Sequence, residues 1–357
     1  MNTLANELSV KYLRLKDRLV FIGPVNSGMP PKGGDEYKNQ LAVLQLQRFY
    51  TLKLIDTVGW KMNPFVIFNV LFHLAFNQSY NKFIISASTL SALRLIKIAN
   101  KLVFRKAKIV YWVIGGELDR VLLDRPQLVP ILYGLKAIVV ETHKLDANLK
   151  EIGLTNTVKI SNFKDFNIRN VGNRIKQGTN IPLKLVFLSR ICETKGVTVI
   201  FDAIDHFPKD IFEVDFYGPI DLDYKAFFLN EINSRENANY KGYLNLQSDF
   251  EKSIDVLSTY DLFLFPTFWK SEGHAGVLID AMCAGLGIIA TDWNSNYEFI
   301  TNNGTLITPR NAHSLVDALN IYLENPELIV EHGNASLENV KDYHISNIFP
   351  QYLATLN

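Results

Sequence analysis

The chain alternates short apolar runs with stretches of helical periodicity. In the first half, strand-like runs cover 19–23, 83–86, 109–113 and 137–140, and helical stretches cover 36–54, 90–104 and 144–152. In the second half, strand-like runs cover 184–188, 213–217, 262–265 and 287–291, and helical stretches cover 196–205, 222–233, 248–258, 276–284 and 312–323. This alternation is typical of parallel sheets with helices on both faces. It predicts an α/β fold with two doubly wound, Rossmann-like domains.

A polar stretch with two glycines, 167–180, separates the two series of strands. The sequence therefore predicts an N-terminal domain over 1–166 and a second domain over 181–340. In open parallel sheets, ligands bind beyond the carboxyl ends of the strands. Two such domains facing across a cleft would hold a substrate of two parts, so we expect the chemistry between them.

Composition excludes several classes of protein. The 357 residues are 48% hydrophobic and 20% charged, which is too apolar for a disordered chain. The two cysteines, Cys192 and Cys283, belong to no metal-binding spacing, so a zinc site and a disulfide framework have no support. A reducing, cytoplasmic location is expected.

Two apolar stretches of the chain bear on membrane targeting. The start is polar, and its next apolar stretch, 19–22, is too short for a signal-peptide core, so no export is expected. The longest apolar run, 64–76, is shorter than the roughly 18 residues that span a bilayer. We predict that this run is a buried helix.

Charge is distributed unevenly. Residues 1–165 hold 23 Lys and Arg against 12 Asp and Glu, whereas 166–357 hold 14 against 24. Within the basic half, 90–108 places five cations at helical spacing, namely Arg94, Lys97, Lys101, Arg105 and Lys108. Such a basic amphipathic helix fits an anionic membrane surface, and a solvated outer helix face is an equally good interpretation. Nucleic acid is not expected, because no recognised binding module accompanies the charge.

Two loops have the composition of anion-binding loops. The loop 188–196 carries Arg190 and Lys195 between a strand and a helix, where two cations could neutralise a diphosphate. The loop 23–38 contains the pair Gly33 and Gly34 before a helix, which lets backbone amides approach an anion. Plain connecting loops are the alternative in both cases.

The segment 261–291 carries two acids. Glu272 lies in the loop after a strand, and Asp280 follows eight residues later on a helix. The two carboxylates could line one side of a cleft and accept hydrogen bonds from sugar hydroxyls. A glycosidase pair is the alternative, but the cationic loop favours a substrate with both sugar and phosphate.

In order along the chain, the motifs S-R-x4-K-G, D-x-F-x2-P-x5-E-G-x6-D-A-M-x-A-G and a strand ending in A-T-D resemble the family-four retaining glycosyltransferases of the GT-B fold. The resemblance is specific over 183–325 and looser over the first half. It implies a C-terminal helix, 341–357, packing back toward the N-terminal domain. It also implies transfer of a hexose-type unit, with retention, from a UDP- or GDP-linked sugar to a saccharide, either a lipid-linked or an exopolysaccharide intermediate.

The resemblance assigns roles to residues of this chain. It implies that Arg190 and Lys195 bind the donor diphosphate, that Glu272 holds the sugar and that Asp280, where the family usually has Glu, holds the ribose. The expected catalytic residues are Arg190, Lys195 and Glu272, and the expected donor-binding set is Gly33, Gly34, Arg190, Lys195, Tyr243, Glu272, Gly273, His274, Ala275 and Asp280. No cofactor is expected, and because Arg190 and Lys195 could neutralise the diphosphate, transfer is predicted to need no metal.

The acceptor side departs from the family. The family often has a histidine at the end of an N-domain strand, whereas the strand ends here, 85–90 and 112–117, have none. Ser86, Ser88, Thr89, Gly115 and Gly116 are the candidates that shape the acceptor side, and no base is assigned. Two alternatives stay open on sequence grounds: a degenerate GT-B protein that assists another transferase, and a GT-B sugar epimerase.

Overall fold

The computed structural model describes residues 17–31, 33–60, 63–75, 79–102, 107–171, 181–244, 246 and 249–357. These residues form two compact units. Unit 1 comprises the described residues up to Glu141, with Leu145–Ile160 and Phe349–Asn357, and unit 2 comprises Thr142–Lys144 and the described residues of Ser161–Ile348. The domain bounds expected from the sequence stay a prediction beside this division.

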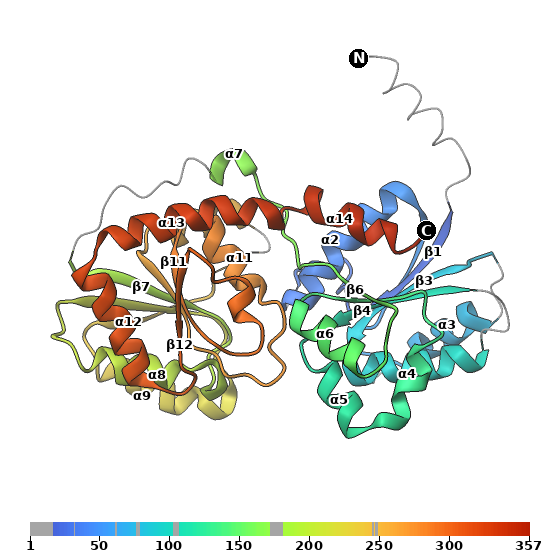
Figure 1. Ribbon diagram of the computed structural model, residues 1–357, viewed down its shortest axis with the longest axis horizontal. Coiled ribbons are helices and arrows are strands. Elements are labelled where there is room, and N and C mark those ends of the chain that lie inside the picture. The colour runs from blue at the N-terminus through green and yellow to red at the C-terminus, as the bar shows by residue number, and fades with distance from the viewer. Residues whose placement is uncertain are drawn as a thin grey trace, which may run out of the picture. The chain divides into compact units, whose positions relative to one another are not determined.

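The described part of unit 1 is built on a six-stranded parallel sheet of order β2-β1-β3-β4-β5-β6 (Figure 1). Its strands are β1 (Arg18–Gly23), β2 (Thr51–Asp56), β3 (Lys82–Ser88), β4 (Lys108–Ile114), β5 (Ala137–Val140) and β6 (Thr157–Lys159). Strand order reverses direction between β1 and β3, which are neighbours, so this is the topological switch point where open α/β sheets commonly bind ligands.

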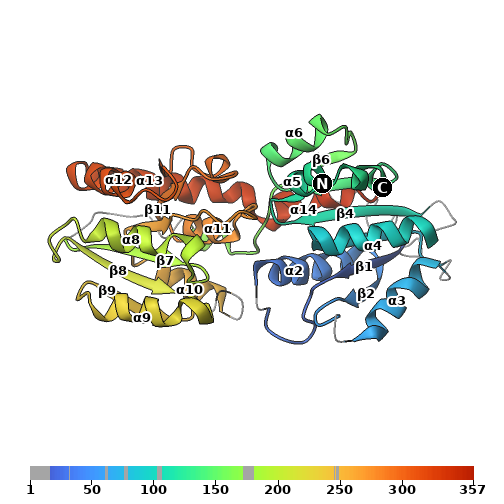
Figure 2. The same cartoon turned by 90° about the horizontal axis from the view of Figure 1, so that it is seen from below.

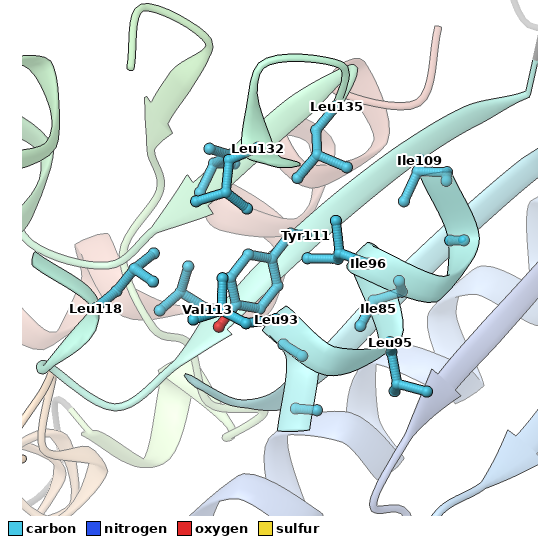
Figure 3. Close-up of a cluster of buried hydrophobic side chains, with 14 of the residues drawn as sticks. Ile85, Leu93, Leu95, Ile96, Ile109, Tyr111, Val113, Leu118, Leu132 and Leu135 are labelled. Atoms are coloured by element: carbon cyan, nitrogen blue, oxygen red, sulfur yellow. The ribbon is translucent and has the colours of Figure 1, made fainter. Parts of the chain in front are cut away.

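Helices cover both faces of this sheet. They are α2 (Gly34–Phe49), α3 (Pro64–Ala75), α4 (Thr89–Leu102), α5 (Leu118–Asp124) and α6 (His143–Glu151), with a 3₁₀ turn at Pro126–Leu132. Figure 3 shows Tyr111 and Val113 of β4 beside Leu93 and Ile96 of α4 in the buried cluster of one face. Burial of these apolar side chains supplies the main stabilisation of unit 1.

The described part of unit 2 repeats the plan with a six-stranded parallel sheet of order β12-β11-β10-β7-β8-β9 (Figure 1). Its strands are β7 (Leu183–Leu188), β8 (Phe212–Tyr217), β9 (Ala238–Gly242), β10 (Leu262–Phe265), β11 (Gly287–Thr291) and β12 (Gly304–Ile307). Side chains of β10 alternate between two buried clusters, with Phe263 and Phe265 in one and Leu262 and Leu264 in the other. Burial on both faces explains why the central strands read as continuous apolar runs.

The helices of unit 2 are α7 (Ile168–Val171), α8 (Val197–Ile204), α9 (Lys225–Asn233), α10 (Phe250–Leu257), α11 (Gly276–Cys283), α12 (Ala312–Glu324) and α13 (Glu327–Asn339). The N-cap of helix α10 is Asp249, whose carboxylate accepts a hydrogen bond from the Lys252 amide. The N-cap of α12 is Asn311, whose side chain accepts one from the Ser314 amide. These side chains satisfy amides that have no partner in the first turn.

The chain ends in α14 (Ile345–Ala354), and residues Phe349–Asn357 belong to unit 1. There the Tyr352 ring packs on Trp112 of β4, with ring centroids 4.6 Å apart. Lys108 of β4 donates a hydrogen bond to the carbonyl of Asn357 at 2.6 Å. The last residues are therefore part of the packing on one face of the unit 1 sheet.

Several expected elements differ from the structure. The helix predicted over 36–54 ends at Phe49, because the chain turns at Tyr50 and continues as edge strand β2. The basic helix predicted over 90–108 is α4, which ends at Leu102. Arg105 lies outside the described residues, and Lys108 lies in β4 instead.

The prediction that the apolar run 64–76 is a buried helix is wrong in its burial. The described residues 64–75 do form helix α3, but Phe65, Phe68 and Phe72 are exposed. Helix α3 packs against β2, an edge strand, and α4, and this packing leaves the three rings outside the core. By contrast, the predicted fold class, α/β with two doubly wound Rossmann-like domains, is confirmed.

Candidate functional site

The cationic loop of unit 2 begins where β7 ends. Arg190 is exposed, its guanidinium lies over the Trp269 ring at 4.8 Å from the centroid, and its Nε lies 3.8 Å from Asp221 Oδ1. Lys195 is buried in a 3₁₀ turn, Glu193–Lys195, just before α8. The loop therefore has one exposed cation, Arg190, and one buried cation, Lys195.

Glu272 is the acid that this loop meets. Lys195 Nζ lies 2.5 Å from Glu272 Oε2, and the Thr267 hydroxyl donates to the same oxygen at 2.8 Å. Both partners of the ion pair are buried, so the two charges are screened less than a surface pair would be. The structure thus brings together a cation and an acid that lie 77 residues apart in sequence.

Backbone and side-chain hydrogen bonds join the loops that follow β7, β10 and β11. The Phe268 amide donates to the Thr194 carbonyl at 2.8 Å. The Thr291 hydroxyl donates to the Thr267 carbonyl, and the Trp293 indole donates to the Trp269 carbonyl at 2.8 Å. Because parallel strands end at one edge of the sheet, these three loops form one connected surface at that edge.

Two glycines permit this close approach of loops. Gly196 has φ +77°, and a Cβ placed on it would lie 2.1 Å from the Pro266 carbonyl oxygen. Gly218, after β8, has φ +134°, and its Cβ would lie 1.8 Å from the Ser189 carbonyl oxygen. Only glycine fits both the backbone conformation and the space at these positions.

Asp280 lies on α11 and is 2% exposed. Lys164 Nζ lies 3.0 Å from its Oδ1 and donates to Oδ2 at 3.1 Å. Burial raises the pKa of the Asp280 carboxyl, against the lowering effect of Lys164. In this structure Asp280, the carboxylate expected to hold a ribose, forms an ion pair with Lys164 of the same unit.

The remaining expected donor residues of unit 2 lie close to α11, with one exception. Glu272, Gly273, His274 and Ala275 form the segment that leads into the helix, and Ala275 is its N-cap. The His274 ring is buried against Phe299, with centroids 3.9 Å apart. Tyr243 stands apart from this group after β9 and is 72% exposed.

Gly33 and Gly34 belong to unit 1, where Gly33 is the N-cap of α2 and Gly34 its first residue. Gly33 has an extended backbone, with φ −150°, and Gly34 has no positive φ. The backbone conformation therefore requires glycine at neither position. A pocket of unit 1 lies at the carboxyl ends of β1, β2 and β3, and its lining includes Pro24, Asp35, Thr57, Trp60, Ala87 and Ser88. This is the switch point of the sheet.

Sequence reasoning missed four residues that shape the site: Lys164, Gly218, Thr267 and Trp269. Thr267 and Trp269 lie in the loop P-T-F-W-K-S-E-G, so their closeness to Glu272 was available as a signal. Lys164 and Gly218 lie outside the motifs, and only the fold brings them to Asp280 and Ser189.

Two parallel, doubly wound α/β units define the fold of GT-B glycosyltransferases. Residues 173–338 match the family model described as glycosyl transferases group 1. The resemblance to group 1 glycosyl transferases is therefore confirmed over that segment, whereas the family-four assignment and the retention of configuration stay predictions.

Solved structures of this fold cover nearly the whole chain. HepE of Anabaena, solved in complex with UDP, matches with a TM-score of 0.69 and 17% identity, over 95% of this chain and 99% of that chain. Sucrose-phosphate synthase of Thermosynechococcus elongatus matches with a TM-score of 0.74 and 14% identity, over 94% and 97%. At this identity the likeness establishes the fold.

A curated relative, the uncharacterized glycosyltransferase MJ1069 of Methanocaldococcus jannaschii, is 28% identical over 178 residues. The match covers 48% of this chain and 42% of the relative, so the chain spans less than half the length of that protein in the match.

Two features of the described residues concern membrane and metal binding. In these ranges no helix is both long and apolar enough to cross a membrane. Nor does this part of the chain gather three or more His, Cys, Asp and Glu side chains where they could hold a metal ion.

The Lys164 and Asp280 pair makes stability depend on pH. Replacing Lys164 with Met leaves Asp280 buried without its cation, so we expect a loss of about 3–5 kcal/mol at pH 7. In the parent protein, burial holds the folded-state pKa of Asp280 above its ordinary value of 3.8, and the loss of Lys164 raises this pKa further. Folding of the variant therefore binds a proton, so its stability falls as pH rises above 3.8. Urea unfolding of Lys164→Met should therefore approach that of the parent protein as pH falls toward 3.8, the ordinary pKa of the carboxyl.

The matched control is Lys164→Met with Asp280→Asn, which removes the titrating group. The stability of this double variant should depend on pH less than that of Lys164→Met, because position 280 no longer titrates. An equal loss for both variants at every pH would contradict the assignment of the effect to the Asp280 charge.

Proposed function

We propose that the protein is a glycosyltransferase that moves a hexose-type unit from a nucleotide diphosphate sugar to a saccharide hydroxyl with retention. The observation that carries the proposal is the surface formed by the Lys195 and Glu272 pair with Arg190, inside the segment that matches the group 1 model. UDP-linked donors are favoured, since HepE has been solved in complex with UDP and with UDP-glucose.

In this proposal Arg190 and Lys195 neutralise the donor diphosphate, and Glu272 holds the sugar with the backbone of 273–275. Gly33 and Gly34 approach the diphosphate, Asp280 holds the ribose, and Tyr243 contributes to donor binding. Lys195 then exchanges its contact with Glu272 for one with phosphate. Cations and amides fixed before the reaction stabilise the charge that develops on the leaving group.

The proposed reaction needs no protein base. The acceptor oxygen forms a bond to the anomeric carbon on the face from which the diphosphate departs. The bond between that carbon and the phosphate oxygen breaks, and the leaving phosphate takes the acceptor proton.

The acceptor is proposed to be a lipid-linked or exopolysaccharide intermediate. The pocket at the switch point of unit 1 supports an acceptor site there, with Ser88 and Asp35 as hydrogen-bonding groups and Trp60 as an apolar wall. Attachment to an anionic membrane surface through the cations of α4, and a cytoplasmic location, complete the proposal.

Donor binding is tested first by thermal unfolding with UDP-, GDP- and ADP-linked sugars. A ligand at about 100 times its Kd stabilises the native state by about 2.7 kcal/mol, so one nucleotide class should raise Tm selectively and be hydrolysed slowly. Arg190→Ala should lower kcat/KM for that donor by about 100-fold, because a cation at the leaving group is lost. Arg125→Ala, an exposed arginine of unit 1, is the control and should change neither value.

If no nucleotide sugar in the panel raised Tm or was hydrolysed, the proposal would be contradicted. Stable association with a second transferase without turnover would then favour the degenerate partner protein. Donor turnover to an epimer without acceptor would favour an epimerase.

Metal removal gives a further prediction. Because Arg190 and Lys195 are proposed to neutralise the diphosphate, transfer should keep its rate in EDTA. Loss of transfer in EDTA with recovery on adding manganese would contradict this part of the proposal.

A further inference from the structure

Helix α3 carries a stripe of phenylalanines on its outer side. Phe65, Phe68 and Phe72 are spaced by three and four residues, which places them on one face of the helix. They are 79%, 66% and 45% exposed, whereas Val70 and Leu74 of the same helix are buried. Exposed aromatic side chains gathered on one element are uncommon on soluble surfaces and mark an interaction site.

The surroundings of this Phe stripe are basic. Helix α4 packs beside α3, and Figure 2 shows the two side by side. The exposed charged residues of the described α4 are Arg94, Lys97 and Lys101, and the helix has no acid. Lys53 of β2 lies near enough to His73 of α3 that it adds to burial in lowering the pKa of that histidine.

The inner side of α3 faces the unit 1 pocket. Val66, Ile67 and Val70 line the pocket together with Leu95 of α4 and Ser88 of β3. The helix that exposes the phenylalanines therefore also forms a wall of the pocket at the switch point.

We propose that α3 inserts the Phe stripe into the interface of an anionic bilayer, with the cations of α4 on the lipid phosphates. Aromatic rings favour the boundary between headgroups and acyl chains, and neighbouring cations add attraction to anionic lipid. A second copy of the chain fits less well, because a two-fold contact through this patch would bring two sets of α4 cations together. The inference rests on the membrane attachment in the proposed function and is independent of sugar transfer.

The test uses the full chain and vesicles of phosphatidylcholine with or without phosphatidylglycerol. The parent protein should cosediment with the anionic vesicles. Phe65→Ser with Phe68→Ser and Phe72→Ser should lower the partition coefficient by about 100-fold, because partial burial of three rings is lost. Arg94→Gln with Lys97→Gln and Lys101→Gln should lower it by about 100-fold, and high salt should lower parental binding.

Matched controls come from unit 2. Leu222→Ser with Phe227→Ser removes exposed apolar side chains, and Lys209→Gln with Lys225→Gln and Lys252→Gln removes three exposed cations. Both controls should bind vesicles like the parent protein. If the triple Phe variant does not fold, Phe65→Ser alone should lower the partition coefficient by about tenfold.

Three results would overturn the inference. If the Phe variants bind anionic vesicles as the parent does while the α4 variant does not, insertion is wrong and attachment by the basic helix stands. If the parent binds no vesicle, both are wrong, and transfer to a free saccharide tests the sugar chemistry separately. If the Phe stripe variant converts a dimer to a monomer in light scattering without vesicle binding by the parent, the occupant is a second copy.

Discussion

Replacing Lys195 with alanine is expected to lower kcat/KM by about 1,000-fold, the upper range for losing a group that stabilises charge in the transition state. The same change leaves Glu272 buried without its cation, so the free energy of unfolding should fall by about 3–5 kcal/mol. Donor kinetics and urea unfolding measure the two effects separately.

The matched pair of controls separates catalysis from stability. Lys195→Met with Glu272→Gln removes both charges and should regain most of the stability while activity stays low. Lys209→Ala breaks an exposed pair with Glu236 and should change stability by less than about 1 kcal/mol. Parental activity in Lys195→Ala would refute the site assignment.

Gly196→Ala is expected to produce a large structural effect from a single methyl group. The added Cβ meets the Pro266 carbonyl oxygen at 2.1 Å, and φ is +77°. Neither atom can move without displacing the backbone of the loops after β7 and β10, so we expect a loss of more than about 3 kcal/mol in unfolding free energy. Activity should also fall at least about tenfold, because Lys195 and Thr267 lie in those loops.

Substitutions at two other glycines separate the cost of backbone strain from the cost of the steric clash. Gly242 has φ +78° with no atom within 4 Å of its Cβ position, so Gly242→Ala should cost only the backbone strain, about 1 kcal/mol. Gly134 has neither a positive φ nor a close neighbour, and Gly134→Ala should lie within about 0.5 kcal/mol of the parent. An equal loss for Gly196→Ala and Gly242→Ala would exclude the clash as the cause.

The fold was largely predictable because the central strands are buried on both faces. A strand such as β10 must then be apolar at every position, and Asp261 and Pro266 mark where its apolar run begins and ends. Edge strands were missed for the same reason. β2, β9 and β12 are partly exposed and carry polar residues, so they have no continuous apolar run.

The burial of α3 could not be read from the sequence. Its run of Phe, Val, Ile and Leu has the composition of a core helix, and periodicity cannot distinguish a buried face from an exposed apolar one. Packing against an edge strand and α4 leaves the outer rings uncovered, and that depends on the position of β2 in the sheet.

The sequence by itself determined the order of strands and helices, the cationic and acidic loops, and their likeness to group 1 glycosyltransferases, because local pattern and motif spacing encode them. Only the tertiary structure decided which charges meet. Lys195 reaches Glu272, and Lys164 reaches Asp280, across 77 and 116 residues. Such pairings follow from the side-by-side order of parallel strands and the approach of their loops, which no short stretch of sequence specifies.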